Sequence, residues 1–148
     1  MILPATARLL IVEDESVIRD ILIWMVRPFR YEIATAGDGT EAVTMAAEFK
    51  PDCALLNFMM PTMDGLEASL RIRGALPNCK FAFFTGNYGR PEFHEKYRSY
   101  GFADDLVIGK PFTVVDVLRL LARAGFPARP IVPPDRVQEW IEDGTVLL

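Results

Sequence analysis

The sequence has few residues that could bind a transition metal or form a disulfide framework. It contains one histidine, His94, and two cysteines, Cys53 and Cys79, among 148 residues. The cysteines lie within or beside apolar runs and show neither CxxC nor cysteine–histidine spacing. We therefore expect both to be reduced core residues of a cytoplasmic protein. His94 falls in a predicted amphipathic helix, and we expect it to be a solvated helix residue.

Long apolar runs and an excess of basic charge are also missing. No run approaches the roughly 18 apolar residues of a membrane span. The apolar stretch near the N-terminus is interrupted by Arg8, Glu13 and Asp14, which is unlike a signal peptide. The net charge is −4, whereas nucleic-acid-binding surfaces usually show a basic excess. We expect a cytoplasmic protein without nucleic-acid or membrane partners.

What the sequence does contain is enough apolar residue for one folded domain. Hydrophobic residues make up 51% of the chain and charged residues 24%, which excludes disorder. Residues 9–12 and 53–56 are continuously apolar, as in strands that are buried on both faces. The predicted strands, which include these two runs, are 9–12, 31–35, 53–56, 81–84 and 105–108.

Helical patterns follow each predicted strand. Ile18, Ile21, Leu22 and Met25 have the spacing of a core-facing helix. Further helices are predicted to start at Asp38, Asp64, Pro91 and Thr113, where most of the starts show the cap-plus-acid spacing of a capping box. Five strands that alternate with five helices predict a doubly wound α/β fold, with a flavodoxin-like parallel sheet in the order 2-1-3-4-5.

The composition changes after residue 125. Residues 126–134 form a Pro-rich, extended connector, and Asp135 is predicted to cap a short helix through Ile141. We therefore expect one domain over residues 1–125 and an appended segment, 126–148, that is too short to be a second domain. The segment's apolar residues either seal the domain or extend a contact surface: Trp140, Val146 and Leu147.

Polar side chains follow four of the five predicted strands at the point where each strand ends. They are Glu13 and Asp14, then Asn57, Thr85 and Lys110. In a sheet of this kind, ligands bind at the carboxyl ends of the strands, near the point where the winding reverses. Each residue alone is weak evidence, but the ordered set predicts a functional site.

The motifs around these residues resemble those of receiver domains of bacterial two-component response regulators, the CheY-like family. They are Leu-Ile-Val-Glu-Asp-Glu at 10–15, Met-Met-Pro-Thr-Met-Asp-Gly at 59–65, Thr85-Gly86 and Lys110-Pro111-Phe112, and the resemblance covers residues 9 to about 124. In that family a histidine kinase transfers a phosphoryl group to an aspartate at the end of the third strand. The Lys-Pro bond is typically cis, which the sequence at 110–111 permits.

The resemblance also implies a role for each polar residue. Glu13 and Asp14 would bind Mg²⁺, together with the backbone carbonyl of Met59. The Thr85 hydroxyl and the Lys110 ammonium would bind the phosphoryl oxygens.

Two positions depart from the family pattern. Asn57 stands at the phosphoacceptor position, and an amide cannot form an acyl phosphate as a carboxylate does. The loss of one negative charge implies a weakened Mg²⁺ site and leaves Lys110 to pair with Asp14. The position of the switch aromatic, three residues before the lysine, is Val107, or Leu106 if one extra residue is allowed for.

Three hypotheses follow. The first is an atypical, stand-alone receiver that is not an enzyme. It would signal by contact with a histidine kinase, another signalling protein or a second copy of itself, through the face formed by the fourth helix, fifth strand and fifth helix. The second is an ordinary receiver whose acceptor aspartate has been replaced by Asn57. The third is a small-molecule binder or enzyme, against which the absence of a Gly-rich phosphate loop argues.

Overall fold

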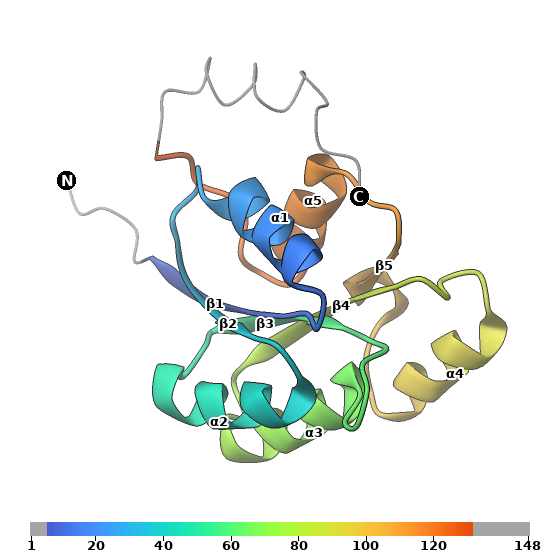
Figure 1. Ribbon diagram of the computed structural model, residues 1–148. Helices are drawn as coiled ribbons and strands as arrows, with labels where there is room; N and C mark the ends of the chain where they lie inside the picture. Colours follow the sequence, from blue (N-terminus) through green and yellow to red (C-terminus); the bar gives the residue numbers. More distant parts are fainter. Residues whose placement is uncertain (1–5, 132–148) are drawn as a thin grey trace.

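The computed structural model describes residues 6–131, which form a five-stranded parallel sheet with helices on both faces (Figure 1). The strand order is β2-β1-β3-β4-β5, as predicted. The strands are β1 (Ala7–Val12), β2 (Tyr31–Ala36), β3 (Cys53–Asn57), β4 (Lys80–Thr85) and β5 (Val107–Gly109). The helices are α1 (Ser16–Val26), α2 (Gly39–Phe49), α3 (Gly65–Ala75), α4 (Pro91–Ser99) and α5 (Val114–Arg123).

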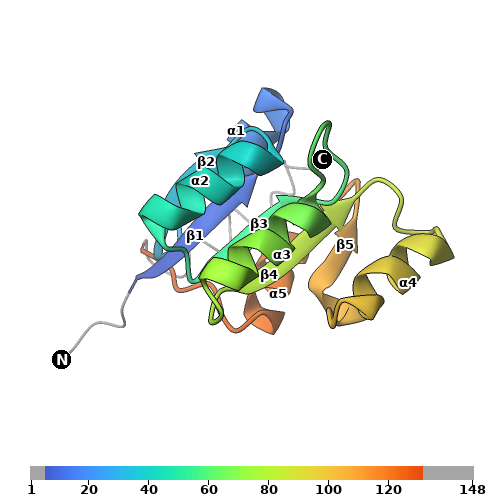
Figure 2. The ribbon, with the colours of Figure 1, turned by 90° about the horizontal axis from the view of Figure 1, so that it is seen from below.

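The helices divide between the two faces of the sheet. In Figures 1 and 2, α1 and α5 cover one face, α2 and α3 cover the other, and α4 lies beside β5 at the sheet edge. Side chains along β1 alternate between two cores: Leu9 and Ile11 pack with α1 and α5, whereas Leu10 and Val12 pack with α2 and α3. The continuous apolar run is therefore explained by burial on both faces.

Helix starts follow the predicted capping residues. The Asp38 carboxylate accepts a hydrogen bond from the Glu41 amide at 2.7 Å, and the Asp64 carboxylate accepts one from Glu67 at 2.8 Å. Thr113 and Asp116 form a reciprocal capping box at the start of α5. Local sequence was sufficient to predict these helix starts.

The predicted bounds of the fifth strand were wrong. Residues 104–106 form a 3₁₀ turn, η1, and β5 runs from Val107 to Gly109. The Leu106 amide donates to the carbonyl of Ala103, and the Asp104 carboxylate is bound by the side chains of Tyr97 and Arg98. These contacts keep residues 104–106 out of the extended conformation, so the strand starts later.

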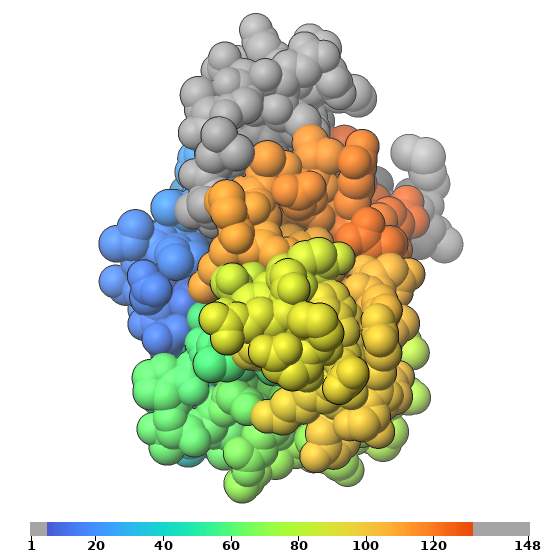
Figure 3. All heavy atoms as spheres, turned by 90° about the vertical axis from the view of Figure 1, so that its right-hand side faces the viewer, coloured from blue at the N-terminus to red at the C-terminus, as the bar shows by residue number. Residues whose placement is uncertain are grey.

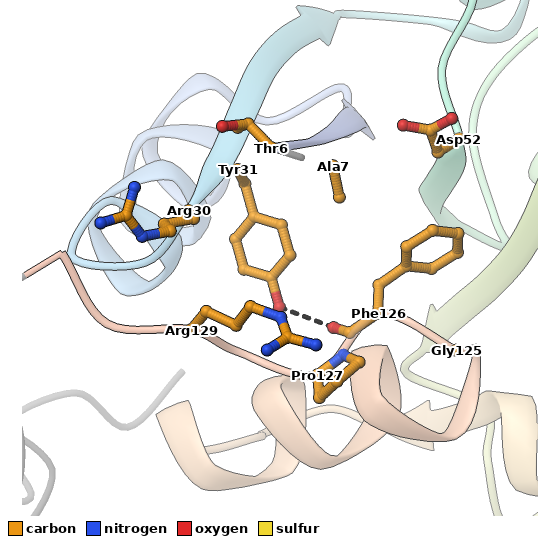
Figure 4. Close-up of a pocket in the computed structure, with 9 residues that line it drawn as sticks. All are labelled: Thr6, Ala7, Arg30, Tyr31, Asp52, Gly125, Phe126, Pro127 and Arg129. Atoms are coloured by element: carbon orange, nitrogen blue, oxygen red, sulfur yellow. Dashed lines mark hydrogen bonds between the residues drawn. The ribbon is translucent and has the colours of Figure 1, made fainter. Parts of the chain in front are cut away.

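The part of the connector that the structure describes, residues 126–131, contains no helix, and it packs against the domain. We call residues 126–131 the C-terminal strap. The Arg30 amide donates to the carbonyl of Arg129 and the Ile131 amide to that of Pro28, each at 2.8 Å. The Tyr31 hydroxyl donates to the carbonyl of Phe126 (Figure 4). The strap thus binds the turn between α1 and β2, and the helix predicted over 135–141 lies outside the described residues.

The strap borders a cavity of about 280 Å³ at the amino-terminal edge of the sheet (Figure 4). Its wall includes Ala7 at the start of β1, Tyr31 at the start of β2 and Asp52 just before β3. This cavity lies at the opposite end of the strands from Asn57. Over residues 6–131, none of the helices has the length and hydrophobicity needed to cross a membrane.

Candidate functional site

The carboxyl ends of the strands bring the predicted site residues together. Glu13 and Asp14 follow β1, Asn57 ends β3, Thr85 ends β4 and Lys110 follows β5. The strands are parallel and aligned so that Asn57 pairs with Phe84 and Thr85 pairs with Gly109. The contacts below join all five of these residues, either directly or through the backbone.

Asn57 lies between the two acidic residues. Its side chain is almost fully buried, and its amide nitrogen Nδ2 lies 3.2 Å from Glu13 Oε1 and 3.2 Å from Asp14 Oδ1. Ionised carboxylates only accept hydrogen bonds, so the NH₂ end of the amide must face them, and it has one N–H for each. The amide therefore supplies partial positive charge at the point where the two carboxylates converge.

Glu13 is the buried acid of the pair. Its Oε1 atom also accepts a hydrogen bond from the Glu15 amide at 3.1 Å. Its Oε2 atom lies 3.5 Å from the Lys110 ammonium, an ion pair without hydrogen-bond geometry. Burial raises the pKa of the Glu13 carboxyl, and the Glu15 hydrogen bond and the Lys110 charge oppose that rise in part.

Lys110 pairs with Glu13, so the predicted pairing with Asp14 was wrong. Glu13 points into the pocket and is fully buried, whereas Asp14 is exposed to solvent. The Lys110 ammonium also lies 5.2 Å from the centroid of the Phe84 ring, a cation–π contact. Burial on the inner side of the pocket thus explains the choice of partner. The Lys110–Pro111 peptide bond is cis, as the resemblance implied.

Thr85 is buried, and it links two loops at the edge of the pocket. Its hydroxyl accepts a hydrogen bond from the Asn87 amide at 3.1 Å, and its carbonyl accepts one from the Lys110 amide at 2.8 Å. The β4–α4 loop and the start of the β5–α5 loop are therefore both anchored to the end of β4.

The loop after β3 folds back against the end of its own strand. The Gly65 amide donates to the carbonyl of Phe58 at 2.9 Å, and a Cβ atom at Gly65 would lie 2.2 Å from the carbonyl oxygen of Asn57. Only glycine allows this approach. Met59 lies in this loop two residues after Asn57, and its side chain is exposed.

Val107, at the position where the resemblance places a switch aromatic, is aliphatic, and rings from other elements occupy this side of the sheet. Val107 is buried in the same core as Phe58, Tyr97 and Phe102. The Phe58 ring makes edge-to-face contacts with Phe93, at a centroid distance of 5.3 Å, and with Tyr97, at 6.4 Å. The residue directly after Asn57 is thereby packed against α4.

His94 is not the solvated helix residue that we predicted, although it does lie on α4. Its Nδ1 atom is 2.8 Å from the Tyr97 hydroxyl and its Nε2 atom is 2.6 Å from the carbonyl oxygen of Tyr88. The spacing of residues 94 and 97 on one helix face was the available signal. The fold of the β4–α4 loop, which supplies the Tyr88 carbonyl, was not apparent from that spacing.

Glu13 and Asp14 offer the oxygen ligands that Mg²⁺ prefers. In this arrangement one oxygen of each already accepts a hydrogen bond from Asn57. Within residues 6–131, no three histidine, cysteine, aspartate or glutamate side chains gather closely enough to hold a metal ion. For these two oxygens to bind a Mg²⁺ ion, the amide NH₂ group would have to turn away from them.

The raised pKa of Glu13 predicts a pH dependence of stability. The folded protein holds the Glu13 proton to a higher pH than the unfolded chain does, so this residue's contribution to stability falls as the pH rises. The fall starts near the ordinary glutamate value of about 4.3 and ends above the raised value. Glu13→Gln should flatten this part of the profile, measured by denaturant unfolding at a series of pH values. Glu48→Gln, on the exposed side of α2, should leave the profile unchanged, and equal profiles for both variants would contradict the assignment.

Comparison with known proteins identifies the family. Residues 9–122 match the model of the response regulator receiver domain. The response regulator MprA of Mycobacterium tuberculosis is 30% identical over 133 residues, which cover 90% of this chain and 55% of MprA. The transcriptional regulatory protein PdtaR of the same species is 37% identical over 112 residues, which cover 75% of this chain and 53% of PdtaR. The chain thus spans about half the length of these relatives.

Solved structures agree. The chemotaxis protein CheY4 of Vibrio cholerae superposes with a TM-score of 0.74 at 27% identity, over 81% of this chain and 99% of CheY4. The receiver domain of sensor histidine kinase PA1611 from Pseudomonas aeruginosa, solved with a magnesium ion coordinated in its active site cleft, gives 0.68 at 26% identity, over 82% of this chain and 99% of that domain. The chain belongs to the response regulator receiver domain family of two-component signalling.

Proposed function

We propose that this receiver works without phosphorylation and signals through protein contacts. The observation that carries the proposal is the environment of Asn57, whose amide donates to both Glu13 and Asp14 at the end of β3. We propose that this is the acceptor position. Aspartyl phosphate forms when an ionised carboxylate attacks phosphorus, and the amide oxygen has neither that charge nor that nucleophilicity. We also propose that the chain is not an enzyme.

In this arrangement, the charged groups of the pocket are bound by other groups of the protein. Two carboxylates face one ammonium and one amide NH₂ group, so each acid has a donor or a cation. An aspartate at position 57 would add a third carboxylate and remove the two amide donors. Three carboxylates at one place repel one another, and a bound divalent cation relieves that repulsion. We infer that the Asn57 pocket binds Mg²⁺ weakly and does not depend on it.

The contact partner is proposed from the family and the surface. We propose a histidine kinase or another signalling protein, with the face of α4, β5 and α5 as the contact surface, including contact between two copies of this chain. The retained fold and pocket support this assignment, and the net charge of −4 argues against a nucleic-acid partner. We also propose that residues 1–125 are the receiver and that residues 126–148 are appended to it, in a cytoplasmic protein.

A second candidate is an ordinary phosphorylatable receiver in which Asn57 replaces the acceptor aspartate. The pocket favours it in one respect, because Glu13, Asp14, Thr85 and Lys110 all stand at the strand ends where phosphoryl chemistry would need them. In this case the other site residues would support phosphorylation as soon as a carboxylate is restored at position 57.

The conformational response to a phosphodonor tests the first proposal. We expect the amide NMR spectrum of the chain to stay unchanged around Thr85 and Lys110 when a small phosphodonor and Mg²⁺ are added together. The reason is that nothing in the Asn57 pocket accepts the phosphoryl group. Specific shifts of these amides that require both additions would overturn the proposal, and Mg²⁺ alone and phosphodonor alone serve as controls.

A further inference from the structure

A second cluster of hydrogen bonds lies away from the Asn57 pocket, between α4 and the turn before β5. It runs from the carbonyl of Tyr88 through the His94 ring and the Tyr97 hydroxyl to the carboxylate of Asp104. The Tyr97 hydroxyl lies 3.1 Å from Asp104 Oδ1, and Arg98 binds the same carboxylate. Figure 3 shows α4 in yellow on the surface of this side of the molecule.

The number of protons available in this series of hydrogen bonds determines the protonation state of His94. The Tyr88 carbonyl only accepts, so His94 Nε2 must carry a proton. The Tyr97 hydroxyl has a single proton. When that proton is given to Asp104, the hydroxyl accepts from His94 Nδ1, which must then be protonated as well. The chain of bonds is complete only when the imidazole carries both protons and a positive charge.

Asp104 and Tyr97, at the other end of this series of hydrogen bonds, are in the charge states that the proton count requires. Hydrogen bonds from Arg98 and Tyr97 lower the pKa of Asp104, so its carboxylate is ionised at neutral pH. Burial and the hydrogen bond to Asp104 raise the pKa of the Tyr97 hydroxyl, so it keeps its proton. Of the three side chains, His94 is therefore the one whose imidazole can exist with either one or two ring protons.

When His94 loses one proton, the hydrogen bond between His94 and Tyr97 reverses its direction. Neutral His94 keeps its Nε2 proton on the Tyr88 carbonyl, and Nδ1 becomes an acceptor. The Tyr97 proton then turns from Asp104 to His94, within the same helix. The direct side-chain link that remains between α4 and Asp104 is the pair with Arg98, in which both side chains are about half exposed and which solvent and salt screen.

We propose that His94, Tyr97 and Asp104 form a pH-sensitive latch that fastens α4 to the turn before β5 when His94 is protonated and releases it when His94 is neutral. The ionisable and charged groups around the latch are Tyr88 from the β4–α4 loop, Arg98 and Glu95 from α4, and Asp104 from the turn. The Arg98 charge among them is paired with the Asp104 carboxylate.

The latch is connected to the Asn57 pocket by two packing contacts. The Tyr97 ring packs on Phe58, which directly follows Asn57. Tyr88 packs on Gly109, which directly precedes Lys110, so closely that a Cβ atom at Gly109 would lie 2.8 Å from Tyr88 Cβ. A shift of α4 or of the Tyr88 loop therefore meets both sides of the pocket without any change at Asn57.

The ring nitrogens of His94 report the latch directly, because the sequence has one histidine and its signals need no assignment. We expect long-range proton–nitrogen NMR spectra of the full chain to show two protonated ring nitrogens at acidic pH. At alkaline pH, Nδ1 should be deprotonated and Nε2 protonated. A neutral ring that carries its proton on Nδ1 would overturn the proposal, because Nε2 faces a carbonyl.

Tyr97→Phe removes the hydroxyl and keeps the ring on Phe58. We expect the His94 signals of this variant to change at a lower pH than those of the unmodified protein, and those of Tyr100→Phe, an exposed tyrosine next to α4, to change at the same pH as in the unmodified protein. Identical titrations in all three proteins would overturn the latch.

Hydrogen exchange measures whether α4 is released. In the unmodified protein, the protection of the α4 amides, corrected for intrinsic exchange, should fall by about tenfold to a hundredfold as the pH rises and His94 loses its second proton, the loss expected for one hydrogen bond to a charged group. His94→Gln should remove this pH dependence while Tyr100→Phe keeps it. Protection that is independent of pH in the unmodified protein would overturn the release. Neither outcome depends on Asn57 or on phosphorylation.

Discussion

Asn57→Asp is expected to destabilise the metal-free protein by about 1–3 kcal/mol and to raise its affinity for Mg²⁺ by about tenfold to a hundredfold. The substitution replaces an NH₂ group that donates to Glu13 and Asp14 with a third carboxylate at the same place. Without a cation, the three carboxylates repel one another in a largely buried pocket. Mg²⁺ should restore the lost stability by binding the folded state.

Asn57→Ala separates the two causes of this effect. It removes the amide donors without adding a charge, so it should lose stability but gain little affinity for Mg²⁺. The measurements are denaturant unfolding with and without Mg²⁺ and calorimetric Mg²⁺ titration of all three proteins. If the unmodified protein and Asn57→Asp bind Mg²⁺ equally well, the amide does not oppose metal binding and this account of the pocket is wrong.

Phe58→Ala is expected to lower the free energy of unfolding by about 3–5 kcal/mol. The Phe58 side chain is 1% exposed and makes edge-to-face contacts with Phe83, Phe93 and Tyr97. Alanine would leave a cavity between the end of β3 and α4, because rings on three sides lose their contact together.

The neighbouring Met59→Ala is the matched control, since its side chain is 51% exposed and its substitution should change stability by less than about 0.5 kcal/mol. Both variants are compared by denaturant unfolding. A loss below about 1 kcal/mol for Phe58→Ala would mean that α4 is not held to the sheet by this cluster.

The sequence predicted the parts of the molecule that depend on local patterns. Apolar runs such as Leu9–Val12 mark strands, and cap residues such as Asp38 and Thr113 mark helix starts, because each depends on residues a few positions apart. The site residues were predicted to meet because parallel strands bring their carboxyl ends to one edge. The cysteines are free and buried, as expected.

Contacts between residues that are far apart in the sequence could not be predicted from local patterns. Lys110 had two acids to choose from, and the choice of Glu13 depends on which of the two points inward from the end of β1. The hydrogen bonds of His94 depend on the path of the β4–α4 loop, and the docking of the C-terminal strap depends on backbone groups near Pro28. Each of these requires the relative placement of two elements, which neither element's own sequence determines.

We propose that a receiver with the Asn57 pocket and the His94 latch keeps the family fold without depending on phosphoryl transfer. In this proposal, the Asn57 amide and the Lys110 ammonium offset part of the charge of the two carboxylates, and the latch makes the attachment of α4 respond to a proton. The two features are joined by packing, through the contact of Tyr97 with Phe58 and that of Tyr88 with Gly109.

The central claim, that the amide at position 57 prevents phosphorylation, is tested most directly by intact mass spectrometry after incubation with Mg²⁺ and a small phosphodonor. We predict that the mass of the unmodified protein does not change, and that Asn57→Asp, treated in parallel, gains the mass of one phosphoryl group. A phosphoryl group found at position 57 in the unmodified protein would contradict the account.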